Sequence, residues 1–369
     1  MKKLDAIQVL RGVAALIVVT CHASDMVQGA AHETHLSRYT SNHLGGSGVD
    51  LFFCISGFIL ASIALRLRPS PTSPLVAAAD FLSRRFLRIL PIYWLTSLFV
   101  VILEVKHHNM TLAWFVDSML LLPSLHFPLQ GPIMFIGWTL IFEMFFYYMM
   151  TLNLLFGTRH IVERTVLTIV TLIAIGLLIG FQRPVLILMA NPLNLEFVFG
   201  CVLALLFNHF GTRPRIATTL WVSGCVLLGS TYFFSNFNTG IASFTLNGQL
   251  SWYRVMVWGI PAAMITGGLA FRQPGISSRP GRIAVYLGNA SYSIYLVSVM
   301  VLYFYERIYF VFARLSPDLN VLLAVAVVAV VGVLCHRFVE TPINRYLASR
   351  YTRIAIPRAE PIPLQMVAE

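Results

Sequence analysis

Ten long apolar segments constrain this chain more than any other feature of its sequence. Each approaches or exceeds the roughly 20 residues that a helix needs to cross a bilayer. Only 11% of the 369 residues are charged, whereas about a quarter are charged in a typical soluble domain. The segments are 7–27, 47–65, 89–105, 133–156, 164–181, 193–208, 217–234, 252–271, 284–305 and 319–336. The sequence therefore predicts an all-α, polytopic membrane protein, a bundle of about ten transmembrane helices.

The distribution of Lys and Arg predicts the orientation of the bundle. If the N-terminus is cytoplasmic, twenty of the 26 basic residues lie on the cytoplasmic side of the apolar segments and six lie on the other side. The six are Arg38, Lys106, Arg183, Arg254, Arg307 and Arg314. The positive-inside rule describes this asymmetry. Both termini are therefore expected in the cytoplasm, and the protein in the cell inner membrane.

The chain is predicted to contain one integral-membrane domain, residues 1–345, followed by a disordered, proline-containing cytoplasmic tail, 346–369. The apolar stretch 112–122 is too short to cross, so we expect an interfacial or re-entrant helix there. The net charge of +11 is spread between the apolar segments. A nucleic-acid partner would need those charges gathered on one polar surface, so none is expected.

The first apolar segment carries two ionisable residues, Arg11 and His22. Eleven helical positions place both side chains on one face, about 16 Å apart along the axis. Ionisable groups at such depth are costly and normally face a protein interior or a wet cavity. Since an imidazole can exchange a proton near neutral pH, the pair marks a candidate catalytic site.

Acidic residues also occur in the apolar segments. Glu143 lies about ten residues into the fourth segment, where a carboxylate must be neutral, paired or facing a cavity. It could hydrogen-bond His22 or move a proton itself; alternatively, it only ties two helices together. Glu196 is a weaker candidate of the same kind. Asp50, at the start of the second segment, is expected to cap a helix N-terminus.

Three arginines, Arg84, Arg85 and Arg88, lie within five residues before the third apolar segment. Contacts with lipid phosphates at the membrane surface would account for them. The alternative is a phosphate site, because guanidinium groups bind phosphate oxygens through paired hydrogen bonds. Helical spacing would then place Arg85 and Arg88 on one face. Charge alone leaves both interpretations open.

The spacing of potential ligands argues against a metal site. His32, Glu33, His35 and His43 share the first outer loop but lack the spacing of a helical zinc motif. The five cysteines lie in or at the ends of apolar segments, without the paired spacings of zinc or disulfide frameworks. We therefore expect no metal.

With these residues in place, the sequence resembles the membrane-bound acyltransferase-3 family, in particular its exopolysaccharide O-acetyltransferase branch. The resemblance extends from Leu4 to about Arg345 and rests on six motifs in the same order. They are Arg11 and His22 with ten residues between them, Gly48–Phe58, Arg84–Pro91, Gly137–Leu140 followed by Glu143, Leu287–Leu296 and Val339–Pro342. One departure is Ser298, where many members of the family have a histidine.

The resemblance implies an O-acyltransferase that uses cytosolic acyl-coenzyme A, most simply acetyl-coenzyme A. The acceptor would be a hydroxyl of an exopolysaccharide, a lipid-linked oligosaccharide or another cell-envelope carbohydrate on the far side of the membrane. The protein itself would be in contact with membrane lipid. By the same resemblance His22 is the catalytic histidine and Arg11 its basic partner. Arg85 and Arg88, with the adjacent Arg84, would hold the phosphates of coenzyme A.

Two mechanisms and two other functions remain open from the residues alone. His22 could act as a general base, oriented by Glu143, or carry the acyl group covalently. A proton-coupled transporter or flippase for a glycolipid or small molecule would use Arg11, His22 and Glu143 as a relay. The second alternative function is a non-catalytic subunit of a polysaccharide-export assembly, but it leaves the buried charges unexplained.

Overall fold

A computed structural model describes residues 4–30, 44–67, 73–104, 111–123, 131–234, 245–248, 250–273, 275–312 and 314–354. All regular secondary structure within these ranges is helical. Nine helical segments in this part of the chain are long and apolar enough to cross a membrane. They are Asp5–Gly29, Ser47–Ala64, Pro74–Ile102, Phe135–Leu154, Ile161–Ile179, Pro184–Phe210, Ser251–Arg272, Ser291–Phe312 and Pro317–Tyr351. The predicted all-α, polytopic membrane fold is confirmed.

The helices of the described residues follow one another along the chain in a fixed order. They are α1 (Asp5–Ala30), α3 (Ser47–Ala64), α4 (Pro74–Glu104), α5 (Leu112–Met119), η2 (Phe135–Gly137), α6 (Trp138–Leu154), α7 (Ile161–Ile179), α8 (Pro184–Met189), η3 (Pro192–Asn194), α9 (Leu195–Phe210), α10 (Pro214–Phe234), α12 (Ser251–Arg254), η4 (Val255–Gly259), α13 (Ile260–Arg272), α14 (Arg279–Asn289), α15 (Ser291–Phe312), α16 (Pro317–Cys335), η5 (His336–Glu340) and α17 (Thr341–Ile354). Two of them, η4 and η5, are π-helical turns that continue into α13 and α17.

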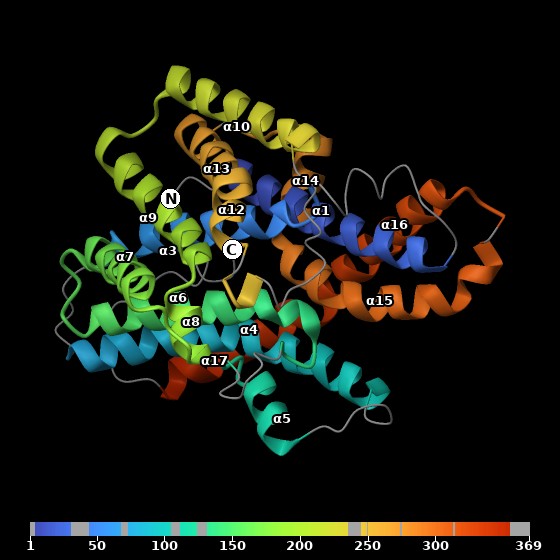
Figure 1. The fold of residues 1–369 in the computed structure, drawn as a ribbon, viewed down its shortest axis with the longest axis horizontal. Helices are drawn as coiled ribbons and strands as arrows, with labels where there is room; N and C mark the ends of the chain where they lie inside the picture. The colour runs from blue at the N-terminus through green and yellow to red at the C-terminus, as the bar shows by residue number, and fades with distance from the viewer. Residues whose placement is uncertain are drawn as a thin grey trace.

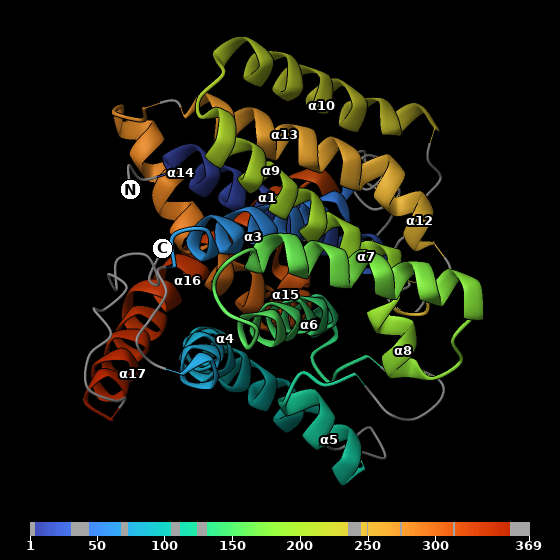
Figure 2. The ribbon, with the colours of Figure 1, turned by 90° about the vertical axis from the view of Figure 1, so that its left-hand side faces the viewer.

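Two central helices organise the bundle. Figures 1 and 2 show α1 and α3 in the middle, with α9, α13 and α10 on one side and α6, α4 and α5 on the other. α3 packs against α9, and α10 packs along α13. α1 contacts α3, α14, α15 and α16. Residues from α1, α3, α4, α6 and α15, distant in the sequence, are thereby brought together.

The predicted segments coincide with these helices, and two boundaries differ. Nine of the ten segments overlap the nine candidate spans, and the tenth, 217–234, is helical within α10. α4 begins at Pro74 rather than near 89, so the three arginines lie inside a helix and not at its entrance. α15 begins at Ser291 rather than 284, because Gly288 packs on the backbone of Gln8 and the chain turns at Ala290.

Two predictions for shorter regions have different outcomes. The stretch 112–122 does contain a short helix, α5, whose N-cap Thr111 accepts a hydrogen bond from the Trp114 N–H. Of the region predicted to be a disordered tail, 346–369, the first nine residues belong to a helix. α17 continues to Ile354 and packs on α4, where the Arg84 guanidinium lies 5.5 Å from the centre of the Tyr351 ring. Residues 355–369 lie outside the described part of the chain.

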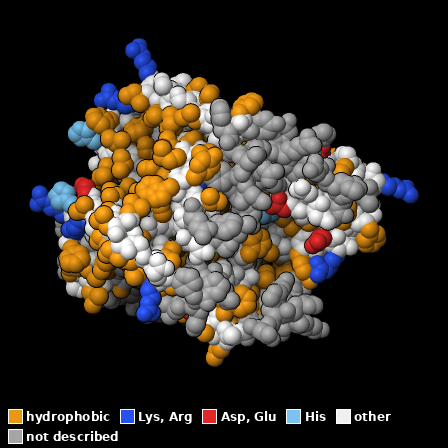
Figure 3. Space-filling view, viewed as in Figure 1, with side chains coloured by type: hydrophobic (Ala, Val, Ile, Leu, Met, Phe, Trp, Pro, Cys, Tyr) orange, Lys and Arg blue, Asp and Glu red, His pale blue; other side chains and the backbone are white. Residues whose placement is uncertain are grey.

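The outer surface agrees with a membrane environment. Large apolar side chains are exposed on several helices, among them Ile102, Leu178 and Phe310. Figure 3 shows hydrophobic side chains over much of the visible face, with Lys and Arg mainly at its periphery. Apolar surface of this extent is stable against lipid rather than water.

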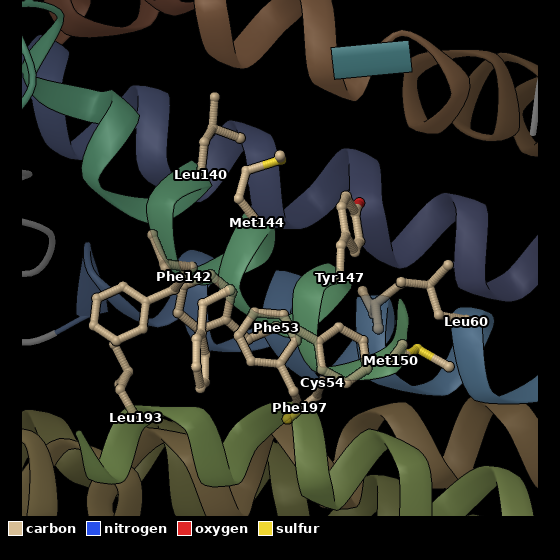
Figure 4. Close-up of a cluster of buried hydrophobic side chains, with 14 of the residues drawn as sticks. Phe53, Cys54, Leu60, Leu140, Phe142, Met144, Tyr147, Met150, Leu193 and Phe197 are labelled. Carbon is tan, nitrogen blue, oxygen red and sulfur yellow. The ribbon is translucent and has the colours of Figure 1, made fainter. Parts of the chain in front are cut away.

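Glycines allow α3 and α9 to pack closely. A Cβ on Gly57 would lie 2.2 Å from the carbonyl oxygen of Phe197, and one on Gly200 would lie 2.2 Å from that of Cys54. Small residues at such crossings let transmembrane helices gain van der Waals contact. The Phe53 and Phe197 rings stack next to this crossing, with centroids 4.5 Å apart, as Figure 4 shows.

An ion pair joins the start of α3 to α12. Both groups are buried: Arg254 Nη2 lies 2.8 Å from Asp50 Oδ2 and Arg254 Nε lies 3.0 Å from Asp50 Oδ1. The guanidinium also lies between the Trp138 and Trp258 rings, 5.4 and 5.3 Å from their centres. The expectation that Asp50 caps a helix is therefore wrong, since its carboxylate faces Arg254 and no side chain caps α3.

We expect the glycine crossing to respond to a single added methyl group. Gly57→Ala or Gly200→Ala should lower the free energy of unfolding by about 1–3 kcal/mol, because the neighbouring backbone cannot move aside. Gly229→Ala is the matched control, since a Cβ there meets no atom within 4 Å. Thermal unfolding of the purified protein in detergent measures the difference. Equal losses in all three variants would contradict the packing argument.

Substituting only Asp50 in the ion pair should destabilise the protein more than substituting both Asp50 and Arg254. Asp50→Leu leaves the buried Arg254 charge without its hydrogen-bonded carboxylate, with Glu196 as the remaining acidic neighbour, and should lower the free energy of unfolding by about 1.5–3 kcal/mol. Combining it with Arg254→Leu removes that uncompensated charge, so the double variant should unfold at a higher temperature than Asp50→Leu alone. A double variant that is less stable than the single one would count against this account.

Candidate functional site

A cavity lies between α1, α3, α4, α6 and α15. Its polar lining consists of Arg11, Ser56, Arg85, Arg88, Thr139, Glu143, Tyr147, Ser291, Tyr292 and Tyr295, and its other lining residues are apolar. The volume is about 80 Å³, and one water needs roughly 10–15 Å³ on the same measure, so several waters fit. Of the six site residues predicted from the sequence, four line this cavity: Arg11, Arg85, Arg88 and Glu143. The other two, Arg84 and His22, do not.

The two ends of the cavity differ in character. On α3 the lining residues run from Val49 to Leu60, and on α6 from Thr139 to Tyr147. Eleven helical residues span about 16 Å, so the cavity is elongated along these helices. The end near Val49 and Thr139 is mostly apolar, and the end near Tyr147 carries the charged side chains.

Three arginines from two helices meet at the charged end. Arg11 comes from α1, and Arg85 and Arg88 come from α4. Arg85 is only 3% exposed, and its Nε and Nη1 atoms have no hydrogen-bond partner among the described residues. An unsatisfied buried guanidinium is costly, so an anionic ligand at this position would stabilise the arrangement.

The position of Arg11 follows from close packing of α1 on α14. A Cβ on Gly288 would lie 1.8 Å from the carbonyl oxygen of Gln8, and one on Gly12 would lie 3.1 Å from the Gly288 nitrogen. This contact brings the start of α15 next to the first turns of α1. Ser291, the first residue of α15, consequently lines the cavity, and its buried hydroxyl has no partner within the described chain.

A carboxylate on α6 faces the arginines across the cavity. Glu143 Oε1 accepts hydrogen bonds from the Tyr147 hydroxyl and, at 3.3 Å, from Ser56 Oγ. Figure 4 shows the Tyr147 hydroxyl directed away from the Phe53 and Phe197 rings. The three arginines outnumber this single carboxylate among the lining residues, so the cavity carries net positive charge.

Arg84 points away from the cavity. Its Nε lies 2.9 Å from Asp80 Oδ2, one turn earlier on α4, and its guanidinium packs over Tyr351 of α17. The sequence had grouped Arg84 with its neighbours as a phosphate ligand. Consecutive residues on a helix differ by about 100° in direction, which is why Arg85 and Arg88 share a face and Arg84 does not.

His22 lies on α1 beyond the apolar end of the cavity and does not line it. Its ring packs edge-on against Phe135, with centroids 5.2 Å apart. The sequence suggested a hydrogen bond between His22 and Glu143. Both residues are described by the structure, and they do not form it. Asp25, three residues further along α1, is the carboxylate that interacts electrostatically with His22.

A helix crossing separates Arg11 from His22. A Cβ on Gly48 of α3 would lie 2.4 Å from the carbonyl oxygen of Ala14 and 2.7 Å from a Val18 methyl group. Ala14 and Val18 lie between Arg11 and His22 on α1, so α3 covers the face that the two residues share. The predicted common face is present, but it does not form one continuous polar passage.

Other sequence candidates lie elsewhere. Glu196 is fully buried next to Gly259, and its carboxyl group interacts with Asp50 and Arg254 rather than with the cavity residues. Ser298 donates to the carbonyl oxygen of Tyr295 at 2.7 Å. Within the described residues, no three His, Cys, Asp or Glu side chains are grouped as metal ligands. His32, Glu33, His35 and His43 lie outside those residues.

A second polar cluster was missed in the sequence. Ser293 donates to Glu340 Oε2 at 2.5 Å, and His336 Nδ1 lies 2.8 Å from the same oxygen. Glu340 belongs to the sixth motif noted in the sequence, and Ser293 to the fifth. The spacing of four between His336 and Glu340 was the only local signal of this pair, and it joins α15 to the π-helical turn η5.

Comparison with known proteins identifies the family to which this chain belongs. A family model described as an acyltransferase domain matches residues 4–337, which include every cavity residue and His22. The exopolysaccharide production protein ExoZ of Rhizobium meliloti (strain 1021) is 28% identical over 272 residues, 71% of this chain and 78% of that protein. No solved structure matches the chain. The protein described here is therefore a multi-pass membrane protein of the acyltransferase-3 family.

Proposed function

We propose that this acyltransferase moves an acyl group, most simply acetyl, from cytosolic acyl-coenzyme A to a hydroxyl of an exopolysaccharide or another cell-envelope carbohydrate. The transfer crosses the inner membrane. The observation that carries the proposal is the cavity with three converging arginines inside an acyltransferase domain. The similarity to ExoZ supports a carbohydrate acceptor.

The charged end of the cavity suits a polyanionic donor. With both termini cytoplasmic, α4 rises from the cytoplasm, and Arg85 lies eleven residues, about 16 Å, from its first residue. Arg11, Arg85 and Arg88 then face the side from which acyl-coenzyme A arrives. Arginine binds phosphate oxygens through paired, charge-assisted hydrogen bonds. Arg85, with two unpartnered nitrogens, is the strongest candidate among the three.

These positions change two roles expected from the sequence. Arg11 lies with Arg85 and Arg88 rather than beside His22, so we assign it to donor binding. Glu143 offsets part of the arginine charge and holds the Tyr147 hydroxyl. In place of Glu143, we propose Asp25, three residues from His22 on the same helix, as the carboxylate that orients the imidazole.

His22 is proposed to act on the acceptor from the opposite side of the membrane. It takes the proton of the acceptor hydroxyl, whose oxygen bonds to the thioester carbonyl carbon, and the carbon–sulfur bond breaks. The proton then passes to the departing coenzyme A thiolate. A covalent acyl-histidine route would use the same side chain as nucleophile, with water excluded until the acceptor hydroxyl arrives.

The decisive experiment follows labelled acyl groups. Purified protein in lipid nanodiscs is incubated with acetyl-coenzyme A labelled in the acetyl group. The acceptor is the exopolysaccharide isolated from the cells that naturally make this protein. Label recovered in ester linkage on the polysaccharide supports the proposal. Movement of the carbohydrate across a vesicle membrane without ester formation would instead support the transporter alternative.

Replacing His22 should abolish transfer without abolishing donor binding. A positioned general base contributes about 10² to 10⁴ in rate, so His22→Ala should reduce esterification at least a hundredfold. Binding of labelled coenzyme A should remain, because the arginines lie beyond the α1–α3 crossing. Normal ester formation by His22→Ala would refute the catalytic role.

Single arginine substitutions should show that Arg85 and Arg88 bind the donor and that the adjacent Arg84 does not. Arg85→Ala and Arg88→Ala should each raise the KM for acetyl-coenzyme A about tenfold or more, since a hydrogen bond to a charged group contributes about 1.5–3 kcal/mol. Arg84→Ala is the matched change, one residue away and directed to Asp80, and should leave that KM within about threefold. A larger effect from Arg84→Ala than from Arg85→Ala would contradict the assignment.

A further inference from the structure

The apolar end of the cavity is closed by side chains that the proposed function does not use. Tyr295 of α15 lines this end and is 7% exposed. Its hydroxyl donates to the carbonyl oxygen of Ile136 at 2.9 Å and lies 3.0 Å from Thr139 Oγ1. The Phe52 ring of α3 lies beside it, with centroids 6.3 Å apart. These residues form a wall across the end of the cavity.

The same wall lies next to His22. Ile136, which accepts the Tyr295 hydrogen bond, directly follows Phe135, and the Phe135 ring packs edge-on against His22. On the α1 side, Gly48 of α3 packs directly on the Ala14 backbone. A group that occupies the apolar end of the cavity is therefore separated from His22 by side chains of α15 and η2 and not by a whole helix.

The character of the two ends orients an amphipathic donor. An acyl thioester of coenzyme A carries its phosphates at one end and an uncharged acyl group at the other. Arg11, Arg85 and Arg88 attract the phosphates to the charged end. The apolar end, lined by Val49, Phe52 and Tyr295, is left for the uncharged end of the molecule.

We propose that this apolar end is the acyl chamber of the donor site and that Tyr295, with Phe52, limits the donor to a short acyl chain. The inference rests on the proposed function and adds the residues that determine donor selectivity. A longer chain would have to displace the Tyr295 ring, which is held through its hydroxyl and whose backbone carbonyl accepts from Ser298. Displacement would also break two polar contacts in an apolar environment.

The wall can be tested by enlarging the chamber. Tyr295→Ala should raise kcat/KM for butyryl-coenzyme A relative to acetyl-coenzyme A at least tenfold, because each methylene accepted by an apolar site changes selectivity by about tenfold or more. Phe52→Val enlarges the chamber from α3 and should shift the ratio in the same direction. It keeps the inference testable if Tyr295→Ala does not fold.

Two control variants distinguish chamber size from general loosening. Tyr295→Phe keeps the ring volume but removes the polar contacts of the hydroxyl, so it should raise the butyryl-to-acetyl ratio less than Tyr295→Ala does. Tyr305→Ala removes another buried tyrosine from α15, 3% exposed and bonded to Asn320, away from the cavity. Its selectivity ratio should equal that of the unaltered protein.

The outcomes separate this inference from the function on which it rests. If the unaltered protein esterifies the polysaccharide but both enlarging variants keep its acyl selectivity, the acyl chamber lies elsewhere and the inference is wrong. If Tyr305→Ala shifts the ratio as much as Tyr295→Ala, the effect is general loosening and the inference also falls. If the unaltered protein transfers no acyl group, the proposed function itself fails.

Discussion

The cost of holding ionised side chains inside an apolar bundle separates the structural charges of this protein from those available to a ligand. Arg254 directs its guanidinium to the Asp50 carboxylate and the Gly46 carbonyl and packs against two tryptophan rings, so its charge is compensated within the protein. Arg85 is buried to the same extent, yet two of its nitrogens lack partners in the described structure. A bundle tolerates such a group where a ligand completes its hydrogen bonds.

Helical periodicity and apolar length, both local properties, made much of this arrangement predictable. The apolar segments gave the fold class, and a spacing of three placed Arg85 and Arg88 on one face. The pairing of Asp50 with Arg254 joins residues 204 positions apart, and no local pattern reports it. The partner of Glu143 was missed for a different reason: Tyr147 is one turn away, but a buried histidine was the more obvious candidate from chemistry alone.

The relation between Arg11 and His22 shows where local reasoning reaches its limit. Both residues share a face of α1, as their spacing predicts, and ionisable groups on such a face normally border a protein interior or a wet cavity. Whether such a face is open depends on what packs on it. Gly48 lets the α3 backbone approach Ala14 so closely that the middle of the face is covered. The glycine is visible in the sequence, but the helix that it will meet is not.

This covered face has a consequence for transfer across a membrane. The transfer across the membrane proposed above requires the donor and acceptor sides to be separated between turnovers, because an open polar passage from the arginines to His22 would let water and ions leak. The backbone contact at Gly48 cannot open without moving α3 as a whole, which also packs on α9 through Gly57 and Gly200. The Tyr295 wall consists of side chains, whose rotation costs a few hydrogen bonds rather than a helix interface. The acyl group should therefore pass on the α15 side of the crossing, where the Tyr295 and Phe135 side chains rather than a helix crossing separate the proposed acyl chamber from His22.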